Sequence, residues 1–142
     1  MKDVVIAMHS IHGCDQEDGD VIDFTTDGSY FQDGDASCFT YLETEVTGLT
    51  GTRTSVIVKP DHVVVNRDGK ITGRMVFRVG EKNSFLYETP FGIATLGVKT
   101  NRIRQSFDEN GGKLEVDYVL DMEHALVMKN KIELNIRQQM GV

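Results

Sequence analysis

Apolar and polar side chains alternate along most of this chain with a period of two residues. In the run 113–122 every even position is apolar, and acidic residues hold most of the odd ones. The runs 74–79, 85–89 and 132–137 repeat the pattern. Successive side chains of a β-strand point to opposite faces, so each run predicts a strand with one buried face. Such half-buried strands are typical of antiparallel sheets, and the pattern therefore predicts an all-β fold.

Short turn signals separate these runs. Asp68-Gly69 predicts a hairpin turn and Asn110-Gly111 a second one, because these residues tolerate the backbone angles of tight turns. Strands are expected at 3–10, 20–31, 36–46, 51–59, 62–67, 71–79, 83–90, 92–100, 102–108, 113–122 and 127–138, with some neighbouring ranges forming one bent strand. The segment 122–131 could form one helical turn, and no longer helix is indicated.

The number of strands favours a closed sheet. Closure removes the exposed edges that invite aggregation, so we expect one domain over residues 1–142, folded as a single antiparallel β-barrel of about 8–10 strands. An open sandwich is the alternative. Pro90 has no N–H to donate, and it predicts a strand break and a tight corner between Tyr87–Thr89 and Ile93–Thr95.

Charge limits the classes of partner. The 142 residues carry a net charge of −7, which disfavours binding to nucleic acid or to an anionic membrane surface. The best basic cluster is Lys99, Arg102 and Arg104. No segment is apolar over the roughly 20 residues of a membrane helix, and the N-terminal run is too short for a signal peptide, so we expect a cytoplasmic protein. Cys14 and Cys38 are then expected as free thiols, with a disulfide left open.

Motifs for metals and catalysis are incomplete. His9, His12 and Cys14 lie close together, but His9 and His12 are an odd number of residues apart and would point to opposite faces of a strand. Counting from Asp15, the acidic turn lacks the spacing of a calcium-binding loop. No nucleophile elbow, phosphate-binding loop or dinucleotide fingerprint occurs. The paired carboxylates, Glu43 with Glu45 and Asp121 with Glu123, are interpreted as solvated. We predict no metal and no cofactor, and the balance leans against an enzyme.

Aromatic residues supply the candidate site. The alternation places these side chains in the barrel interior: Tyr30, Phe39, Tyr41, Phe77, Phe85, Tyr87 and Tyr118. They either fill the core or line a cavity for one small ligand. Buried tyrosine hydroxyls need partners, for which Thr89, Thr95 or an inward-facing charge are candidates. If Phe77 points inward, Arg74 and Arg78 point outward.

One long stretch carries a family resemblance. The residues 68–103 read DGKITGRMVFRVGEKNSFLYETPFGIATLGVKTNRI and resemble the DUF1934, or YwiB-like, family. The matching positions are Gly69, Met75, Phe77, Gly80, Tyr87, Thr89, Phe91, Gly92, Leu96 and Thr100, and the stretch 28–44 fits the family's second and third strands. The resemblance covers about 4–138. It implies a small bacterial protein with a calycin-like, lipocalin-like antiparallel β-barrel, no established activity and no catalytic residues to carry over.

The leading functional hypothesis is a non-enzymatic barrel that binds a small, mainly apolar ligand. Tyr41, Phe77, Phe85, Tyr87 and Tyr118 would line the cavity, and the turns around Gly48 and Gly80 would form its mouth. The second hypothesis is a protein-interaction module with a fully packed core, which makes contact near Pro90 or through an apolar outer patch. A weaker third is a hydrolase or isomerase with an acid–base pair in the cavity. The oligomeric state is open, and a homodimer is one option.

Overall fold

Strands make up nearly all of the described chain. The computed structural model describes residues 2–13, 20–44, 50–122 and 126–139. The strands are β1 (Lys2–Gly13), β2 (Asp20–Asp33), β3 (Ala36–Leu42), β4 (Arg53–Val58), β5 (Val63–Asp68), β6 (Thr72–Phe77), β7 (Lys82–Thr89), β8 (Gly92–Asp108), β9 (Gly111–Met122) and β10 (Leu126–Gln138). No helix occurs within these ranges, which confirms the all-β prediction.

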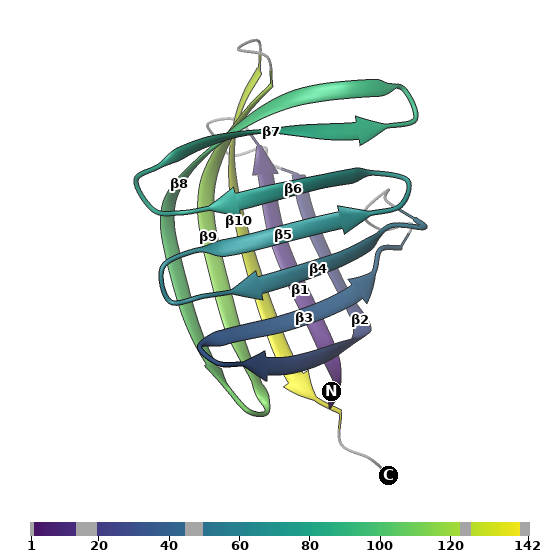
Figure 1. The fold of residues 1–142 in the computed structure, drawn as a ribbon, viewed down its shortest axis with the longest axis vertical. Coiled ribbons are helices and arrows are strands. Elements are labelled where there is room, and N and C mark those ends of the chain that lie inside the picture. The colour runs from purple at the N-terminus through teal and green to yellow at the C-terminus, as the bar shows by residue number, and fades with distance from the viewer. Residues whose placement is uncertain (1, 14–19, 45–49, 123–125, 140–142) are drawn as a thin grey trace.

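The ten strands form one closed barrel (Figure 1). Each strand pairs antiparallel with its neighbours in the chain, and β1 closes the ring by pairing with both β2 and β10. Val4 thus faces Gly28 on one side and Gln138 on the other. This topology confirms the barrel, is consistent with a calycin-like fold, and excludes the open sandwich.

A bulge explains why the sequence indicated two strands where the structure has one. The predicted strands 92–100 and 102–108 form the single strand β8, whose register shifts between Thr100 and Arg102. Before the shift, Val98 and Thr100 face inward; after it, Ile103 and Phe107 pack against the core. The extra residue of a β-bulge changes which positions face inward, and here it makes β8 one bent strand. The one helical turn considered at 122–131 is wrong for residues 126–131, which belong to β10.

The predicted turns are confirmed at Asp68-Gly69, Asn110-Gly111 and Pro90. Pro90 and Phe91 form the turn between β7 and β8, where Thr89 pairs with Gly92. The Thr89 hydroxyl stabilises this turn, because it accepts from Phe91 N at 3.1 Å and donates to Gly92 O at 2.8 Å. Gly69 has φ 144°, and a Cβ there would overlap the carbonyl of Gly51. A side chain at position 69 would therefore be both strained and blocked.

One end of the barrel is filled by stacked aromatic rings. Tyr30 and Phe39 each stack with Phe107, with ring centroids 6.2 and 6.5 Å from its own. The Tyr30 hydroxyl donates to Asp108 O at 2.6 Å. Tyr30 pairs with Lys2, so this plug lies near the end marked N in Figure 1. The interior is therefore packed at this end.

The wall is less regular between β6 and β7. Their register consists of Thr72 with Glu88 and Gly73 with Tyr87. Further along, the Asn83 side chain donates to Val76 O at 3.3 Å, a position where a regular ladder would use a backbone N–H. Figure 1 shows β7 and the first part of β8 diverging from β6 as a hairpin. The interior is thus bounded by fewer backbone hydrogen bonds here than elsewhere.

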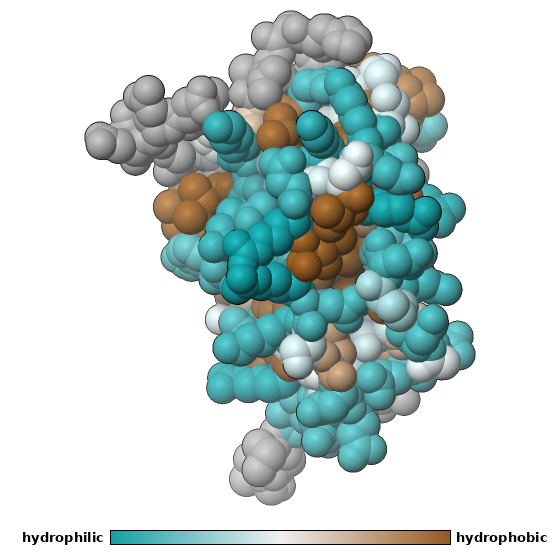
Figure 2. All heavy atoms as spheres, turned by 90° about the vertical axis from the view of Figure 1, so that its left-hand side faces the viewer, coloured by the Kyte–Doolittle hydropathy of each residue, from teal (hydrophilic) through white to brown (hydrophobic). Residues whose placement is uncertain are grey.

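The outer surface is largely hydrophilic in the view of Figure 2, with a few apolar groups between the polar ones. Arg74 is exposed, and Arg78 forms ion pairs with Glu81 at 3.6 Å and Asp61 at 3.9 Å. Both point outward, as predicted from the inward orientation of Phe77. Within the described residues, no helix is long and apolar enough to cross a membrane.

Candidate functional site

The aromatic residues singled out in the sequence all belong to the interior cluster, and they divide into two groups. Tyr30 and Phe39 are part of the plug. The others lie around the middle and opposite end, where Phe77 meets Tyr118 edge-on at 4.9 Å and Phe85 meets Tyr87 at 5.1 Å. The ring centroids of Tyr41 and Phe24 are 6.2 Å apart, and Phe24 was not among the residues expected in the interior. Their inward orientation is confirmed, and a role in lining a ligand cavity stays a prediction.

Sequence reasoning missed a polar group inside the barrel. It consists of Glu43, Thr54 and Arg67, which we call the interior polar group. Glu43 follows β3 and is 4% exposed, and its carboxylate accepts from the Thr54 hydroxyl at 2.7 Å. The interpretation of Glu43 as solvated is therefore wrong. The alternation of β3 and β5 continues into these residues, because Tyr41 and Glu43 share one face, as do Val65 and Arg67.

Arg67 is the most unusual member of this group. Its Nη1 donates to the Tyr87 hydroxyl, and the guanidinium lies 5.9 Å from the centre of the Tyr87 ring. The Nε atom is buried and has no hydrogen-bond partner, and no ion pair of Arg67 occurs among the described residues. A buried N–H donor without an acceptor has lost its hydrogen bonds to water without replacement, and this costs stability.

The surroundings keep Arg67 charged. Burial by itself lowers the pKa of the guanidinium, but Tyr87, Tyr41 and Glu43 together outweigh it, and the net pKa is raised. The group therefore carries a positive charge across the physiological pH range.

A glycine lets Tyr87 reach Arg67. Gly73 lies between them, since it pairs with Arg67 of β5 on one side and with Tyr87 of β7 on the other. The Tyr87 ring lies over Gly73, and a Cβ there would overlap its Cδ1 and Cε1 atoms. The absence of a side chain at position 73 is thus a condition for the contact between Tyr87 and the guanidinium.

Two tyrosines beside Arg67 hold their protons strongly. Burial raises the pKa of Tyr118 to about 12, although Arg67 acts in the opposite direction. Burial also raises the pKa of Tyr41, and Glu43 adds to this effect. The interior therefore disfavours phenolate anions even though a guanidinium is near.

These pKa values predict a loss of stability at high pH. The unfolded chain ionises its tyrosines near pH 10, whereas the folded chain keeps the proton of Tyr118 up to about 12. A raised pKa of an acid stabilises the fold below the unfolded pKa, and this contribution is lost as the pH rises through the folded pKa. Urea unfolding between pH 9 and pH 11.5 should show the decline, and Tyr118→Phe should reduce its slope. An unchanged slope in that variant would contradict the prediction.

Two tyrosine hydroxyls have partners other than Thr89 and Thr95, and Thr95 is exposed. The Tyr87 hydroxyl meets the inward-facing charge Arg67, and the Tyr30 hydroxyl meets a backbone carbonyl. Thr89 does not serve this purpose, because its hydroxyl bonds within its own turn. The inward-facing charge was thus the correct alternative.

The residues considered for metal binding do not assemble in the described part of the chain. His9 contacts Asp23 on the outer face, while Cys14 and the side chain of His12 lie outside the described residues. No group of three metal-ligating side chains is found where the structure is described. Cys38 is a free thiol, and burial, followed by the charge of Asp33, raises its pKa.

Other candidates from the sequence lie on the surface or outside the described ranges. Asp121 forms an ion pair with Lys82 at 2.8 Å on the outer face. Glu45, Glu123 and the turn at Gly48 fall in undescribed segments. Gly80, in the loop after β6, donates to Thr100 O at 3.1 Å. The basic cluster on β8 is exposed, but Arg102 pairs in register with Asp117 and Arg104 with Glu115, so acidic residues lie beside it.

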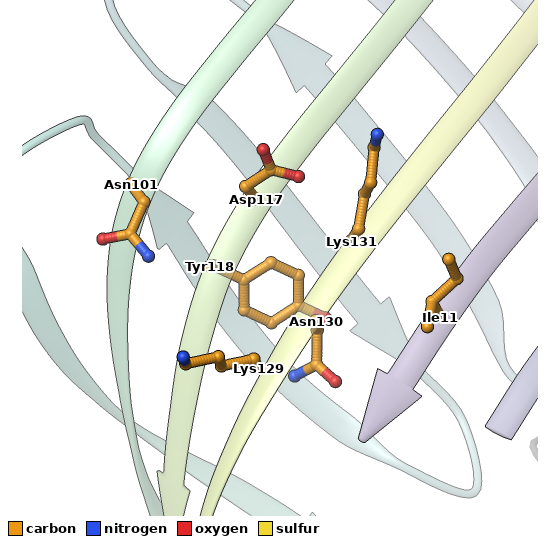
Figure 3. A pocket seen from close by; sticks show the side chains of 7 residues that line it. All are labelled: Ile11, Asn101, Asp117, Tyr118, Lys129, Asn130 and Lys131. Carbon is orange, nitrogen blue, oxygen red and sulfur yellow. The ribbon is translucent and has the colours of Figure 1, made fainter. Parts of the chain in front are cut away.

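A shallow depression of about 260 Å³ opens on the outer wall (Figure 3). Its lining comes from β1, β8, β9 and β10, and comprises Ile11, Asn101, Asp117, Tyr118, Lys129, Asn130 and Lys131. Figure 3 shows the Tyr118 ring between the ribbons of β9 and β10, next to its register partner Asn130. Charges of both signs line this depression. It shares Tyr118 with the surroundings of Arg67, but Arg67, Glu43 and Tyr87 do not line it.

Comparison with known proteins supports the fold and leaves the activity open. The family model described as Domain of unknown function (DUF1934) matches residues 6–134. The crystal structure of the YwiB protein from Bacillus subtilis is similar with a TM-score of 0.84 and 23% identity, covering 98% of this chain and 93% of that one. At this identity the likeness concerns the fold. No curated protein matches the chain.

Proposed function

Because this chain belongs to the DUF1934 family, whose function is unknown, we propose a function from its own interior: the barrel binds one small ligand against Arg67. The observation that carries this proposal is the buried Nε atom of Arg67, which has no partner. A buried N–H donor without an acceptor lowers stability, and such costs are typical of functional sites. We propose binding rather than catalysis as the role of this site.

The rest of the interior supports a ligand with an apolar body. Met75 and Phe77 belong to the buried core, and Phe85 packs against it. Burial of apolar surface contributes about 25 cal/mol per Å², so a small hydrophobic body would supply most of the affinity. A ten-stranded barrel is also wider than the eight-stranded barrels in which side chains just fill the interior.

Partial exposure indicates how the site is reached. Arg67, Phe85 and Tyr87 keep some accessible surface, whereas Tyr41 and Glu43 are buried. The three accessible residues lie on β5 and β7, on either side of β6. Phe85 lies in the part of β7 that has no register partner on β6, so we place the route from solvent past Phe85.

Substitution of Arg67 tests the proposal. We expect Arg67→Met to stay folded and to change the free energy of unfolding by less than about 3 kcal/mol, because removal of the unsatisfied Nε–H donor offsets the loss of the hydrogen bond to Tyr87. The same variant should lose a ligand that native mass spectrometry detects on the purified wild-type protein. Arg74→Met is the matched control, since Arg74 is an exposed arginine on the neighbouring strand. A large drop in stability for Arg67→Met alone would show a structural role and remove the basis of the proposal.

A second candidate is protein interaction through the β7–β8 hairpin. Phe91 at its tip is 99% exposed, and Leu86 and Ile93 on its outer face are 59% and 64% exposed. Clustered exposed apolar groups are typical of contact surfaces. Sedimentation velocity at several concentrations tests for self-association, and Phe91→Ser should abolish any that is seen. A concentration-independent monomer would remove the homodimer option.

The hydrolase or isomerase hypothesis stays a prediction. It requires an acid–base pair in a cavity, and the titratable side chains of Glu43, Arg67 and Tyr87 lie inside the barrel. The residues nearest to Arg67 are tyrosines, and those with a shifted pKa hold their protons more strongly. Proton transfer at neutral pH is disfavoured for such groups, and this is why binding is proposed first.

A further inference from the structure

Resting on the proposed function, we infer that the ligand carries a single carboxylate, held by the Nε edge of Arg67, on a small apolar or aromatic body. The inference concerns the chemical class of the ligand and begins from the guanidinium. Its Nη1 is used by Tyr87, while Nε is buried and unpaired. The edge formed by Nε and Nη2 is therefore the side of the group that Tyr87 does not occupy, and its Nε has no hydrogen-bond partner.

The shape of this edge matches a carboxylate. Nε–H and the adjacent Nη2–H point in parallel directions, and two carboxylate oxygens accept from such a pair simultaneously. A neutral amide or alcohol offers no negative charge, so its hydrogen bonds to this edge would be weaker than those of a carboxylate. Tyr87 fixes the other side of the guanidinium, so this edge is held in one orientation.

The charge of the site favours one negative charge over two. Glu43 lies near enough to influence Arg67 electrostatically, and it is itself buried and bound to Thr54. A phosphate dianion at Arg67 would bring two further negative charges toward this carboxyl group in a medium of low polarity. A monocarboxylate would balance the guanidinium with less repulsion.

The neighbouring side chains define the rest of the ligand. The rings of Phe85 and Tyr87 meet edge-on beside Arg67, and the rings of Phe77 and Tyr118 meet in the same way. These faces suit an aromatic or branched aliphatic body. The buried hydroxyl of Thr100, the register partner of Tyr118, also lacks a hydrogen-bond partner. One hydroxyl or carbonyl on the ligand would satisfy it.

A matched series of probes tests the charge requirement. Isothermal titration calorimetry would measure 3-phenylpropanoate, its amide and phenyl phosphate against the wild-type protein. We expect the carboxylate to bind about tenfold to a hundredfold more tightly than the amide, since charge-assisted hydrogen bonds exceed neutral ones by that factor. Arg67→Met should remove this preference, Arg67→Lys should keep only part of it, and Arg74→Met should leave it unchanged.

The outcomes separate this inference from the proposed function. Equal binding of carboxylate and amide would overturn the carboxylate assignment while leaving an interior binding site intact, and so would tighter binding of the phosphate. No binding of any probe, together with no ligand on the purified protein, would overturn both. Thermal unfolding of each variant confirms that the barrel is folded, and Tyr87→Phe, which retains the charge, is the second variant if Arg67→Met fails to fold.

Discussion

Phe39→Ala is expected to lower the free energy of unfolding by about 3–5 kcal/mol, the largest effect of any substitution considered. Phe39 is 1% exposed and packs on Phe107, which in turn stacks with Tyr30. Removal of the ring leaves a cavity in a plug that the closed wall prevents from collapsing. The loss therefore includes both the transfer of the ring to water and the cost of the void.

Phe31→Ala provides the matched control. Phe31 lies on β2 next to the same strand β3, but it points outward and is 39% exposed. We expect a loss below about 1 kcal/mol, as for most exposed positions. Urea unfolding followed by circular dichroism measures both. Equal losses for the two variants would show that the aromatic stack is not the packed end of the barrel.

Gly73→Ala is expected to lower the free energy of unfolding by about 1–3 kcal/mol and to displace the Tyr87 ring. The added methyl group would occupy the space of that ring. Displacement would also break the hydrogen bond from Arg67 to the Tyr87 hydroxyl. The guanidinium would then lose its one neutral partner, so we expect ligand affinity to fall together with stability.

A double-mutant cycle isolates this effect. With Tyr87→Ala in place there is no ring to displace, so adding Gly73→Ala should cost much less than it does in the wild-type protein. The difference between the two costs measures the coupling of the two positions. Additive losses would indicate that the backbone at position 73 requires glycine whether or not the Tyr87 ring is present.

The strands could be predicted from the sequence because most have one polar face. The fused strand β8 was harder, since its alternation changes phase at the bulge. The phase change is nonetheless visible: Val98 and Thr100 are inward at even positions, and Ile103 and Phe107 at odd ones. Closure of the barrel was inferred from the number of strands, and pairing of β1 with β10 confirms it.

The candidate site was only partly predictable. The tyrosines and phenylalanines were found because aromatic residues at alternating positions indicate a core. Arg67 and Glu43 were missed because charged residues near the ends of strands usually reach water. Their signal was the position itself: Arg67 continues the inward series of Val63 and Val65, and Glu43 that of Phe39 and Tyr41. The role of Gly73 required coordinates, since it depends on a side chain from another strand.

Closure of the ring through β1 and β10 has a consequence for synthesis of the chain. Val4 emerges from the ribosome long before Gln138, its partner across the seam. Until the last strand arrives, β1 has a neighbour on one side and offers an unsatisfied row of amides and carbonyls on the other. We expect joining of this seam to be a late step of folding, because contacts between distant residues form slowly. Nascent chains would be most prone to aggregation in that interval.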